Sequence, residues 1–385
     1  MIKSFTNQHK RVLVIGPFSS PHFQVMISAV AKFGFRTTFI PSDLPTKHDM
    51  SSISKNILSF RARIPMLYRL LSSLSFAYTI LDKLYGLKWR STFIRYFLYI
   101  CNPEIIHVNE IQRAGYSVGR INNIAKIKQN RIILTSSWGS DIMLFGHVDS
   151  HEPDMRKILE ISDVLMSERD AELEIARKLG FNGLFESPSY CTIGTKHRYN
   201  NPTPCSSRKI ILIKGYQNFA GRALNALNAI ERCKEDLEGF KVLVFSASED
   251  TKLEVELMRE RSGIDIRCLD KISKIEFLEK FASARIYIGI GISDGLSTSM
   301  VEAMGAGTFP IQSENSGAKD FLVDGVNGFI VDPWDLPSLQ KCISRALKDD
   351  DLVDKAQKSN AGIIEDKYDY EKNVMKLSEI YLRQA

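Results

Sequence analysis

The sequence predicts an α/β protein built from two doubly wound, Rossmann-like domains. Its 385 residues suit two domains of ordinary size, and 44% of them are hydrophobic, as in folded globular proteins. Short runs rich in β-branched residues alternate with helical patterns, which is typical of parallel strands joined by crossover helices. The alternation occurs in two series, separated at 187–207 by a linker-like stretch of Pro, Asn and Ser without periodicity.

The first series begins with a buried strand, a turn and a helix, at 12–15, 16–21 and 22–33. Further strands are expected at 37–40, 105–108, 132–135 and 164–167, and helices at about 112–128 and 169–179. Between 50 and 100, two or three helices rich in Leu, Phe, Tyr, Lys and Arg follow one another. We therefore expect an N-terminal domain at 1–190 with a helical insertion at about 50–100.

The second series has strands expected at 209–213, 242–245, 264–267, 286–290, 309–312 and 328–331. It predicts a C-terminal domain at 208–368, followed at 369–385 by a last helix that returns to the N-terminal domain. In doubly wound sheets, ligands bind at the carboxyl ends of the strands. We therefore expect the ligand crevice where these ends of the two domains face each other.

The formal net charge of +6 hides an asymmetry between two parts of the chain. Residues 1–148 hold 19 Lys and Arg against 6 Asp and Glu, whereas the remaining residues hold 32 against 39. A strongly basic part predicts an anionic partner, such as nucleic acid, a phosphorylated ligand or a membrane surface. No nucleic-acid-binding motif accompanies the charge, so nucleic acid is the least favoured of the three.

The cysteines and apolar runs predict a cytoplasmic protein. None of the six cysteines belongs to a Cys-x-x-Cys pair, which favours a reducing compartment. The apolar run at 11–15 is too short for a signal peptide, and the one at 64–81 is interrupted by Arg69 and several serines. The sequence also lacks the common zinc, P-loop, serine-hydrolase and dinucleotide motifs, so we expect no metal and no cofactor.

The stretch at 291–310 is the most informative one. It follows an expected strand, passes through a loop that contains Gly295, and enters a helix expected to start near Ser297. A helix start offers unpaired N–H groups and the positive end of a dipole, and so suits an anion. Asp294 and Glu302 can project toward the strand ends, but two structural alternatives stay open. Asp294 also suits a turn, and Ser299 with Glu302 forms a possible capping box.

This stretch resembles the signature of nucleotide-sugar glycosyltransferases of the GT-B fold, in the large retaining family 4, also called glycosyltransferase group 1. The matching residues are Asp294-Gly295, Glu302-Ala-Met-Gly-Ala-Gly307 and Pro310, with further matches at 315–320, 324–333 and 368–370. The resemblance covers 208–385 well and 10–190 loosely. Asp294 departs from the pattern, which has Glu there, and its reach is one methylene shorter.

The resemblance implies roles in binding a nucleotide-sugar donor. Glu302 would hold the ribose hydroxyls and Asp294 the donor sugar, while backbone amides of Gly295, Leu296 and Ser297 would face the sugar and diphosphate. The family also supplies cations to the diphosphate. Tyr216 stands where an arginine is expected, so Arg222 is the first candidate cation and Lys214 the second. The structural alternatives are an ordinary first-turn arginine and a solvated lysine at a strand end.

The N-terminal domain offers three weaker likenesses. Gly16 begins the turn where the family has a glycine-rich loop. His22, which follows this turn, also suits a surface residue at the start of a helix. His107 is expected to be a packed strand residue, and Glu110 at the strand end is the better crevice candidate. Trp138 takes the position of a family histidine, with an indole N–H and a stacking face. Asp141 then becomes a hydroxyl ligand or an acceptor-side base, or else a cap of the next helix.

The insertion is basic and aromatic, and Asp82 is its only acid between 55 and 100. Such helices can lie on an anionic bilayer, or their aromatic side chains can pack the insertion onto the domain. The residues concerned are Arg61, Arg63, Arg69, Lys83, Lys88, Arg90 and Arg95, with Phe60, Tyr68, Phe76, Tyr78, Tyr85, Trp89, Phe93, Tyr96 and Phe97.

The resemblance implies a retaining glycosyltransferase of the hexosyltransferase type. It would move a sugar from a nucleotide-sugar donor to a hydroxyl of a glycan or lipid-linked acceptor, at the inner face of the cytoplasmic membrane. Bacterial surface polysaccharide or lipopolysaccharide synthesis is the expected setting. The alternatives are a nucleotide-sugar epimerase or a phosphorylase on the same fold, and a non-catalytic partner that binds nucleotide-sugar or glycan.

Overall fold

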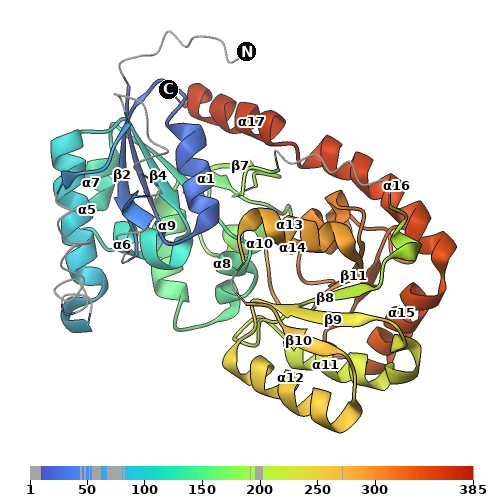
Figure 1. Ribbon diagram of the computed structural model, residues 1–385. Coiled ribbons are helices and arrows are strands. Elements are labelled where there is room, and N and C mark those ends of the chain that lie inside the picture. The colour runs from blue at the N-terminus through green and yellow to red at the C-terminus, as the bar shows by residue number, and fades with distance from the viewer. Residues whose placement is uncertain are drawn as a thin grey trace. The chain divides into compact units, whose positions relative to one another are not determined.

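The computed structural model describes residues 10–384, apart from 44, 45, 47, 48, 52, 54–61, 67–79, 81, 82, 191, 196–202 and 271. The chain divides into two compact units (Figure 1). Unit 1 comprises Met1–Gly194 and Tyr370–Ala385, and unit 2 comprises Thr195–Asp369. Within the described ranges, no helix is both long and apolar enough to cross a membrane.

Unit 1 contains a parallel sheet of seven strands in the order β3-β2-β1-β4-β5-β6-β7. The strands are β1 (Arg11–Gly16), β2 (Arg36–Pro41), β3 (Ala62–Arg63), β4 (Ile105–Asn109), β5 (Ile132–Ser136), β6 (Val164–Met166) and β7 (Leu184–Glu186). The α-helices whose bounds lie within the described residues are α1 (Pro21–Val30), α5 (Leu87–Cys101), α6 (Tyr116–Gly119), α7 (Ile124–Lys128), α8 (Ser140–Met143), α9 (Glu152–Ile161), α10 (Glu172–Lys178) and α17 (Tyr370–Arg383).

Unit 2 contains a parallel sheet of six strands in the order β10-β9-β8-β11-β12-β13. The strands are β8 (Ile210–Lys214), β9 (Lys241–Phe245), β10 (Ile266–Cys268), β11 (Ala284–Gly289), β12 (Phe309–Ser313) and β13 (Phe329–Val331). The α-helices are α11 (Ala223–Arg232), α12 (Glu249–Ser262), α13 (Lys274–Ser283), α14 (Thr298–Gly305), α15 (Leu336–Lys348) and α16 (Asp350–Lys367).

Both sheets are doubly wound. In unit 2 the chain adds β9 and β10 on one side of β8, and then returns to add β11, β12 and β13 on the other side. The order therefore reverses between β8 and β11, and in unit 1 it reverses between β1 and β4. Helices cover both faces of the unit 2 sheet, with α13 and α14 on one face and α11 and α12 on the other (Figure 1). Ligands of such sheets bind at the reversal point, outside the carboxyl ends of the strands.

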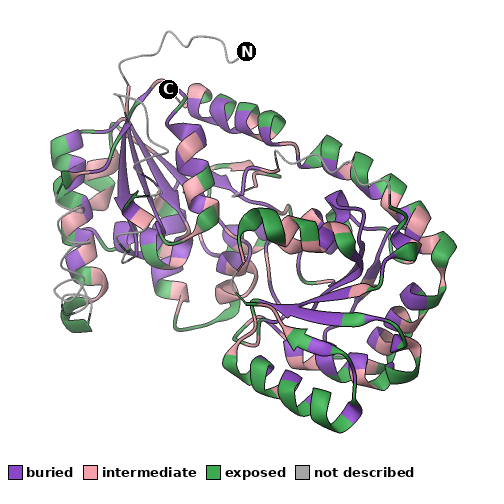
Figure 2. Cartoon of the chain, viewed as in Figure 1, coloured by how far each residue is buried: buried purple, intermediate pink, exposed green. Residues whose placement is uncertain are grey.

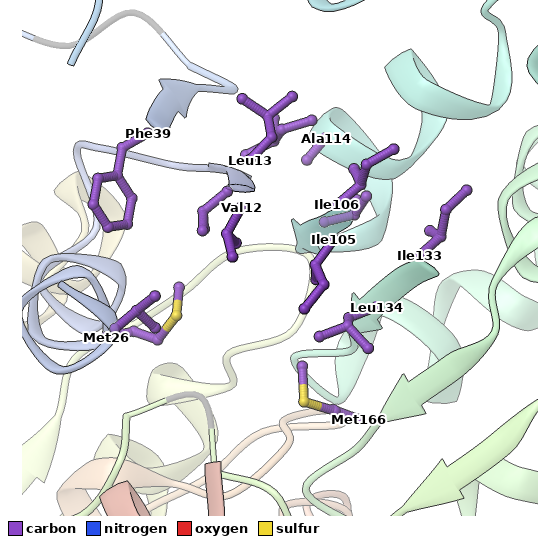
Figure 3. Packing of buried hydrophobic residues seen from close by; sticks show 14 of the residues in the cluster. Val12, Leu13, Met26, Phe39, Ile105, Ile106, Ala114, Ile133, Leu134 and Met166 are labelled. Carbon is purple, nitrogen blue, oxygen red and sulfur yellow. The ribbon is translucent and has the colours of Figure 1, made fainter. Parts of the chain in front are cut away.

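The strands form the buried centre of each unit (Figure 2). In unit 1, Val12, Leu13, Ile105, Ile106 and Leu134 pack together from three neighbouring strands (Figure 3). Parallel strands covered on both faces bury successive side chains, which explains why these runs are continuously apolar rather than alternating. The same pattern made the main strands predictable from sequence.

Two features of unit 1 differ from the predictions. The helix expected at 112–128 is broken into a π-helical turn, Ile111–Gly115, followed by α6 and α7. Asn123 interrupts it in the left-handed conformation, with a φ of 59°, which Asn tolerates better than most residues. The short strands β3 and β7 were not predicted, because Arg63 is one of the two residues of β3, and β7 has two apolar residues before Glu186.

The last helix, α17, begins and ends as the periodicity predicts, and its side chains join the core of unit 1. Tyr381 stacks near Phe35 at 6.1 Å and meets Phe33 edge-on at 5.6 Å between ring centroids. Its hydroxyl lies 2.5 Å from Nδ1 of His107 on β4, whose Nε2 lies 2.7 Å from the Ser136 hydroxyl. Burial lowers the pKa of His107 to about 3, so this ring is neutral and packed, as expected.

Candidate active site

Lys214 and Asp294 form an ion pair at the reversal point of the unit 2 sheet. Lys214 is the last residue of β8, and Asp294 lies in the loop after β11. The Lys214 Nζ is 3.3 Å from Oδ2 of Asp294, and the two side chains are 20% and 36% exposed. The other carboxylate oxygen accepts the N–H of Gly295 at 3.0 Å. Asp294 is therefore both a turn residue and an ion-pair partner.

The surroundings of Lys214 keep it cationic. Burial lowers the pKa of Lys214, but the charge of Asp294 and the nearby Tyr287 and Tyr216 more than offset this effect. The pKa therefore lies above its ordinary value. The ammonium lies 5.1 Å from the ring centroid of Tyr216. Tyr287 is buried on β11, with its hydroxyl 3.5 Å from that of Ser297. The alternative of a solvated strand-end lysine is thus wrong.

The loop after β8 is bound to the loop after β11. Gly221 and Gly291 form a bridge, the Arg222 N–H donates to Ile290 at 2.9 Å, and the Ile292 N–H donates to Ala220 at 2.8 Å. A Cβ at Gly221 would lie 2.2 Å from the carbonyl oxygen of Tyr216, so only glycine fits there. These backbone contacts hold the Lys214 and Asp294 segments in register.

The amides of Gly295 and Ser297 have acceptors inside the protein. The Gly295 N–H donates to Asp294, and the Ser297 N–H donates to the carbonyl of Ser316 at 3.3 Å. Leu296 is buried. Ser297 is the N-cap residue of α14, which confirms the expected helix start. The first amides of the helix proper belong to Thr298 and Ser299, and amides at these positions have no acceptor within their own helix.

Glu302 lies on α14 with its side chain 11% exposed, in an ion pair with Lys274. Burial raises the pKa of Glu302, and the charge of Lys274 opposes this shift. The capping-box interpretation of Ser299 and Glu302 is wrong, because Ser297 caps α14 without a side-chain hydrogen bond. The real capping box lies one helix earlier, where Ser273 and Glu276 begin α13.

Arg222 is the N-cap residue of α11, and its guanidinium contacts its own loop. Nη1 donates to the carbonyls of Asn218 at 2.9 Å and Gly221 at 2.7 Å. The guanidinium carbon lies 5.0 Å from the ring centroid of Trp334. Within the part of the chain that the structure describes, Arg222 forms no ion pair. Its positive charge is therefore uncompensated by any described carboxylate.

In unit 1, Asp141 is buried after β5, and the half-buried Glu110 lies near it after β4. Burial, followed by the charge of Asp141, raises the pKa of Glu110 to about 7, although the Ser42 hydroxyl donates to it at 2.8 Å. Burial raises the pKa of Asp141 to about 6, against the N–H groups of Trp138 and Ile111 at 3.0 and 3.2 Å. Gly139 is the N-cap residue of α8, so the helix-cap interpretation of Asp141 is wrong.

The other unit 1 candidates have structural partners. The indole N–H of Trp138 donates to the Asn109 side chain at 2.7 Å, which leaves the indole rings for contacts. His22 meets these rings edge-on, with 6.5 Å between centroids. Gly16 ends β1, and a Cβ there would lie 2.5 Å from the ring of Phe23, so glycine permits close packing of α1.

The structure describes only part of the basic, aromatic insertion at about 50–100. Trp89 and Phe97 are buried, whereas Tyr85 and Tyr96 are more than half exposed, so the described aromatic residues divide between core and surface. The residues Phe60, Arg61, Tyr68, Arg69, Phe76, Tyr78 and Asp82 lie outside the described residues. Across the described ranges, no group of three or more His, Cys, Asp or Glu side chains is arranged to hold a metal ion.

Sequence reasoning missed Lys274 and Tyr287. A Ser-x-x-Glu pattern at 273–276 could have placed Lys274 at the first position of a helix, but nothing local indicates its pairing with Glu302. Tyr287 is an ordinary strand aromatic by sequence. Its place beside Lys214 depends on the pairing of β11 with β8, in which Tyr287 is opposite Leu212.

Comparison with known proteins shows a likeness to glycosyltransferases in sequence and in fold. Residues 206–362 match the family model described as "Glycosyl transferases group 1". A search of curated protein sequences gave no match. Among solved structures, HepE from Anabaena in complex with UDP-glucose has 13% identity and a TM-score of 0.71, with 97% of this chain and 100% of that chain covered.

Two further structures have a comparable likeness. Sucrose-phosphate synthase from Thermosynechococcus elongatus has 15% identity and a TM-score of 0.70, covering 97% of this chain and 98% of that one. The lipopolysaccharide outer core galactosyltransferase WaaB has 14% identity and a TM-score of 0.64, covering 96% and 99%. At these identities the likeness concerns the fold, which is the GT-B fold of two Rossmann-like domains.

Proposed function

We propose that this protein is a glycosyltransferase that moves a sugar from a nucleoside diphosphate donor to a hydroxyl acceptor. One observation carries the proposal. Asp294 and the largely buried Glu302 lie on the loop and helix that follow β11, and Lys214 pairs with Asp294 from the end of β8, at the reversal point of the unit 2 sheet. This arrangement lies inside the segment that matches the glycosyltransferase family model.

Glu302 suits the ribose of the donor. A carboxylate offers two acceptor oxygens to a pair of neighbouring hydroxyls. Lys274, its present partner, is 61% exposed and can return to water at little cost when a ligand enters. UDP-glucose, the ligand in the HepE structure, is the first donor to examine.

The diphosphate needs positive charge, because negative charge grows on the leaving phosphate as the glycosidic bond breaks. The neighbours of Lys214 raise its pKa and so keep it positively charged, and Arg222 has no described carboxylate partner. The start of α14 adds the positive end of a helix dipole. We propose that these three groups stabilise the leaving group, while Asp294 orients Lys214 and contacts the donor sugar.

We propose retention at the anomeric carbon and a hexosyl donor, as the resemblance to family 4 implies. In this scheme the leaving phosphate takes the proton of the acceptor hydroxyl, and the protein contributes positioning and charge. Asp141 is the proposed acceptor-side residue. The proposed acceptor is a glycan or lipid-linked sugar of a bacterial surface polysaccharide or lipopolysaccharide, used at the inner face of the cytoplasmic membrane.

The test is a donor panel that begins with UDP-glucose, measured as donor hydrolysis and as transfer to lipid-linked sugars. Glu302→Gln keeps the shape but removes the charge. The loss of one charged hydrogen bond should raise the donor KM by roughly 10- to 100-fold, with a smaller effect on kcat.

Glu231→Gln is the matched control, because this carboxylate lies on α11 and pairs with Arg261 instead. An unchanged donor KM in Glu302→Gln would remove Glu302 from the donor site. Donor binding without turnover on any acceptor would favour a non-catalytic nucleotide-sugar-binding protein. Donor isomerisation without transfer would favour an epimerase.

A further inference from the structure

A second charged region lies in unit 1, at the amino ends of the strands. A pocket of about 500 Å³ opens between the start of the sheet and the end of α5. Its lining residues are Arg11, Val12, Arg36, Thr38, Arg63, Ile100, Cys101 and Asn102. Arg11 and Arg36 begin β1 and β2, so the pocket lies at the opposite edge from Gly16 and Glu110. The six residues of β1 separate the two edges by roughly 16 Å.

The positive charges of the three arginines in this pocket are not all paired with described carboxylates. Arg11 is paired with Glu104, through Nη2 at 2.8 Å and Nε at 3.2 Å. Among the described residues, Arg63 meets two weak acceptors, the Thr38 hydroxyl at 3.3 Å and the Cys101 sulfur at 3.9 Å. Arg36 is exposed, and within the described ranges its guanidinium has no ion-pair partner.

The described residues before Glu104 supply little negative charge, and Asp82 lies outside the described residues. Residues 1–103 contain three acidic residues, Asp43, Asp49 and Asp82. Asp43 accepts the N–H groups of Phe18 and Ser19, and Asp49 accepts that of Thr46. The carboxyl end of α5 contributes about half a negative elementary charge. Together with Glu104, this is smaller than the charge of three guanidinium groups, so a surplus of positive charge remains.

We propose that this pocket is a second anion site, which takes a phosphate monoester or diphosphate group. Guanidinium groups bind phosphate through two parallel N–H donors, and the Thr38 hydroxyl and Asn102 side chain add neutral polar groups to the lining. Three like charges around one pocket repel each other, and a bound dianion removes this repulsion. The site is independent of the donor site proposed for unit 2.

The phosphate has two possible sources, a soluble phosphorylated molecule or a lipid headgroup. Ile100, which lines the pocket, is 52% exposed, and the adjacent Tyr99 is 85% exposed. Both side chains could contact acyl chains next to a headgroup. Inorganic pyrophosphate represents the first source, and vesicles that contain phosphatidylglycerol represent the second.

The test is hydrogen–deuterium exchange of the full chain with increasing pyrophosphate, which reports on each region separately. Amides at 36–38 and 98–106 should exchange more slowly when the pocket is filled. The double substitution Arg36→Ser and Arg63→Ser should raise the half-maximal concentration at least tenfold. Arg95→Ser is the matched control, since Arg95 is exposed on α5 but does not line the pocket.

The vesicle arm uses sedimentation with phosphatidylglycerol and with phosphatidylcholine alone. Slower amide exchange at the pocket with pyrophosphate indicates a soluble ligand. Stronger binding to phosphatidylglycerol vesicles than to phosphatidylcholine vesicles, lost in the double variant, indicates a lipid headgroup. Either result supports the site. The proposal is overturned if neither probe acts at the pocket, or if the double variant, folded by its melting curve, equals wild type. Donor hydrolysis is scored separately, so this result does not depend on the proposed activity.

Discussion

The side chain of Asp294 is one methylene shorter than that of Glu, and this difference sets its contacts. The family that the sequence resembles has Glu at this position, whereas here the shorter carboxylate accepts the next N–H of its own turn. Its second oxygen remains for Lys214. The turn thus fixes the carboxylate, and the carboxylate in turn holds the ammonium at the end of β8.

Lys214→Met tests the role of this cation. Methionine has a similar length but no charge, so the leaving diphosphate would lose one stabilising group. We expect kcat to fall by about 100- to 1000-fold in single-turnover measurements. Lys209→Met, at the other end of the same strand segment, serves as control because Lys209 lies over the Phe240 ring. Equal rates in the two variants would exclude Lys214 from the chemistry.

Glu172 predicts a pH dependence of stability. It is fully buried at the start of α10, and burial raises its pKa to about 8, helped by the charges of Asp141 and Glu168 and opposed by the hydroxyls of Ser137 and Ser167. In the unfolded chain this carboxyl releases its proton near its ordinary value of 4.5. Between these pH values the folded state binds more protons, so the free energy of unfolding falls as pH rises.

Glu172→Gln removes this titration. The variant should match wild type near pH 4.5 and exceed it at pH 8.5 by a few kcal/mol at most, measured by urea unfolding. Glu174→Gln, on the same helix but 79% exposed and paired with Lys178, should leave the pH profile unchanged. A constant difference between Glu172→Gln and wild type across this range would contradict the raised pKa.

At the scale of elements, the predicted strands were more accurate than the predicted helix ends. Continuous apolar runs gave the core strands of both sheets, because strands buried on both faces must be apolar throughout. The Ser-x-x-Glu pattern occurs three times, at Ser246, Ser273 and Ser299, and only the copy at Ser273 caps a helix. The copy at Ser299 lies inside α14, because this helix already starts after Ser297, so its Ser and Glu do not form a cap.

The contact between the loops after β8 and β11 predicts a strong effect of Gly221→Ala. The added Cβ would meet the Tyr216 backbone at 2.2 Å, and backbone cannot move aside as a side chain can. We expect a stability loss of about 1–3 kcal/mol and a raised donor KM, measured by thermal unfolding and donor kinetics.

Gly362→Ala is the matched control, since a Cβ there meets nothing within 4 Å on α16. This variant should gain up to about 1 kcal/mol from helix propensity. If Gly221→Ala has the same stability and the same donor KM as Gly362→Ala, the close approach of the two loops is not required.

At the scale of the whole chain, the C-terminal helix α17 belongs to unit 1 although 175 residues of unit 2 precede it. Tyr381→Phe removes the hydroxyl that meets Nδ1 of His107 and leaves a buried ring nitrogen without its partner. We expect a loss of about 1–3 kcal/mol in the free energy of unfolding. Tyr99→Phe, an 85% exposed position of the same unit, should stay within about 0.5 kcal/mol of wild type. If Tyr381→Phe is as stable as wild type, the hydrogen bond between Tyr381 and His107 does not contribute to stability.

The sequence by itself determined the α/β class, most of the strands, and the loop–helix that contains Asp294 and Glu302. These follow from local patterns, because apolar periodicity and turn residues act over a few neighbours. Only the tertiary structure decided which cation meets which carboxylate. Lys214 and Asp294 are 80 residues apart, and Lys274 and Glu302 are 28 apart. Such pairs depend on the order of strands in the sheet and on how the helices pack, which no local pattern records.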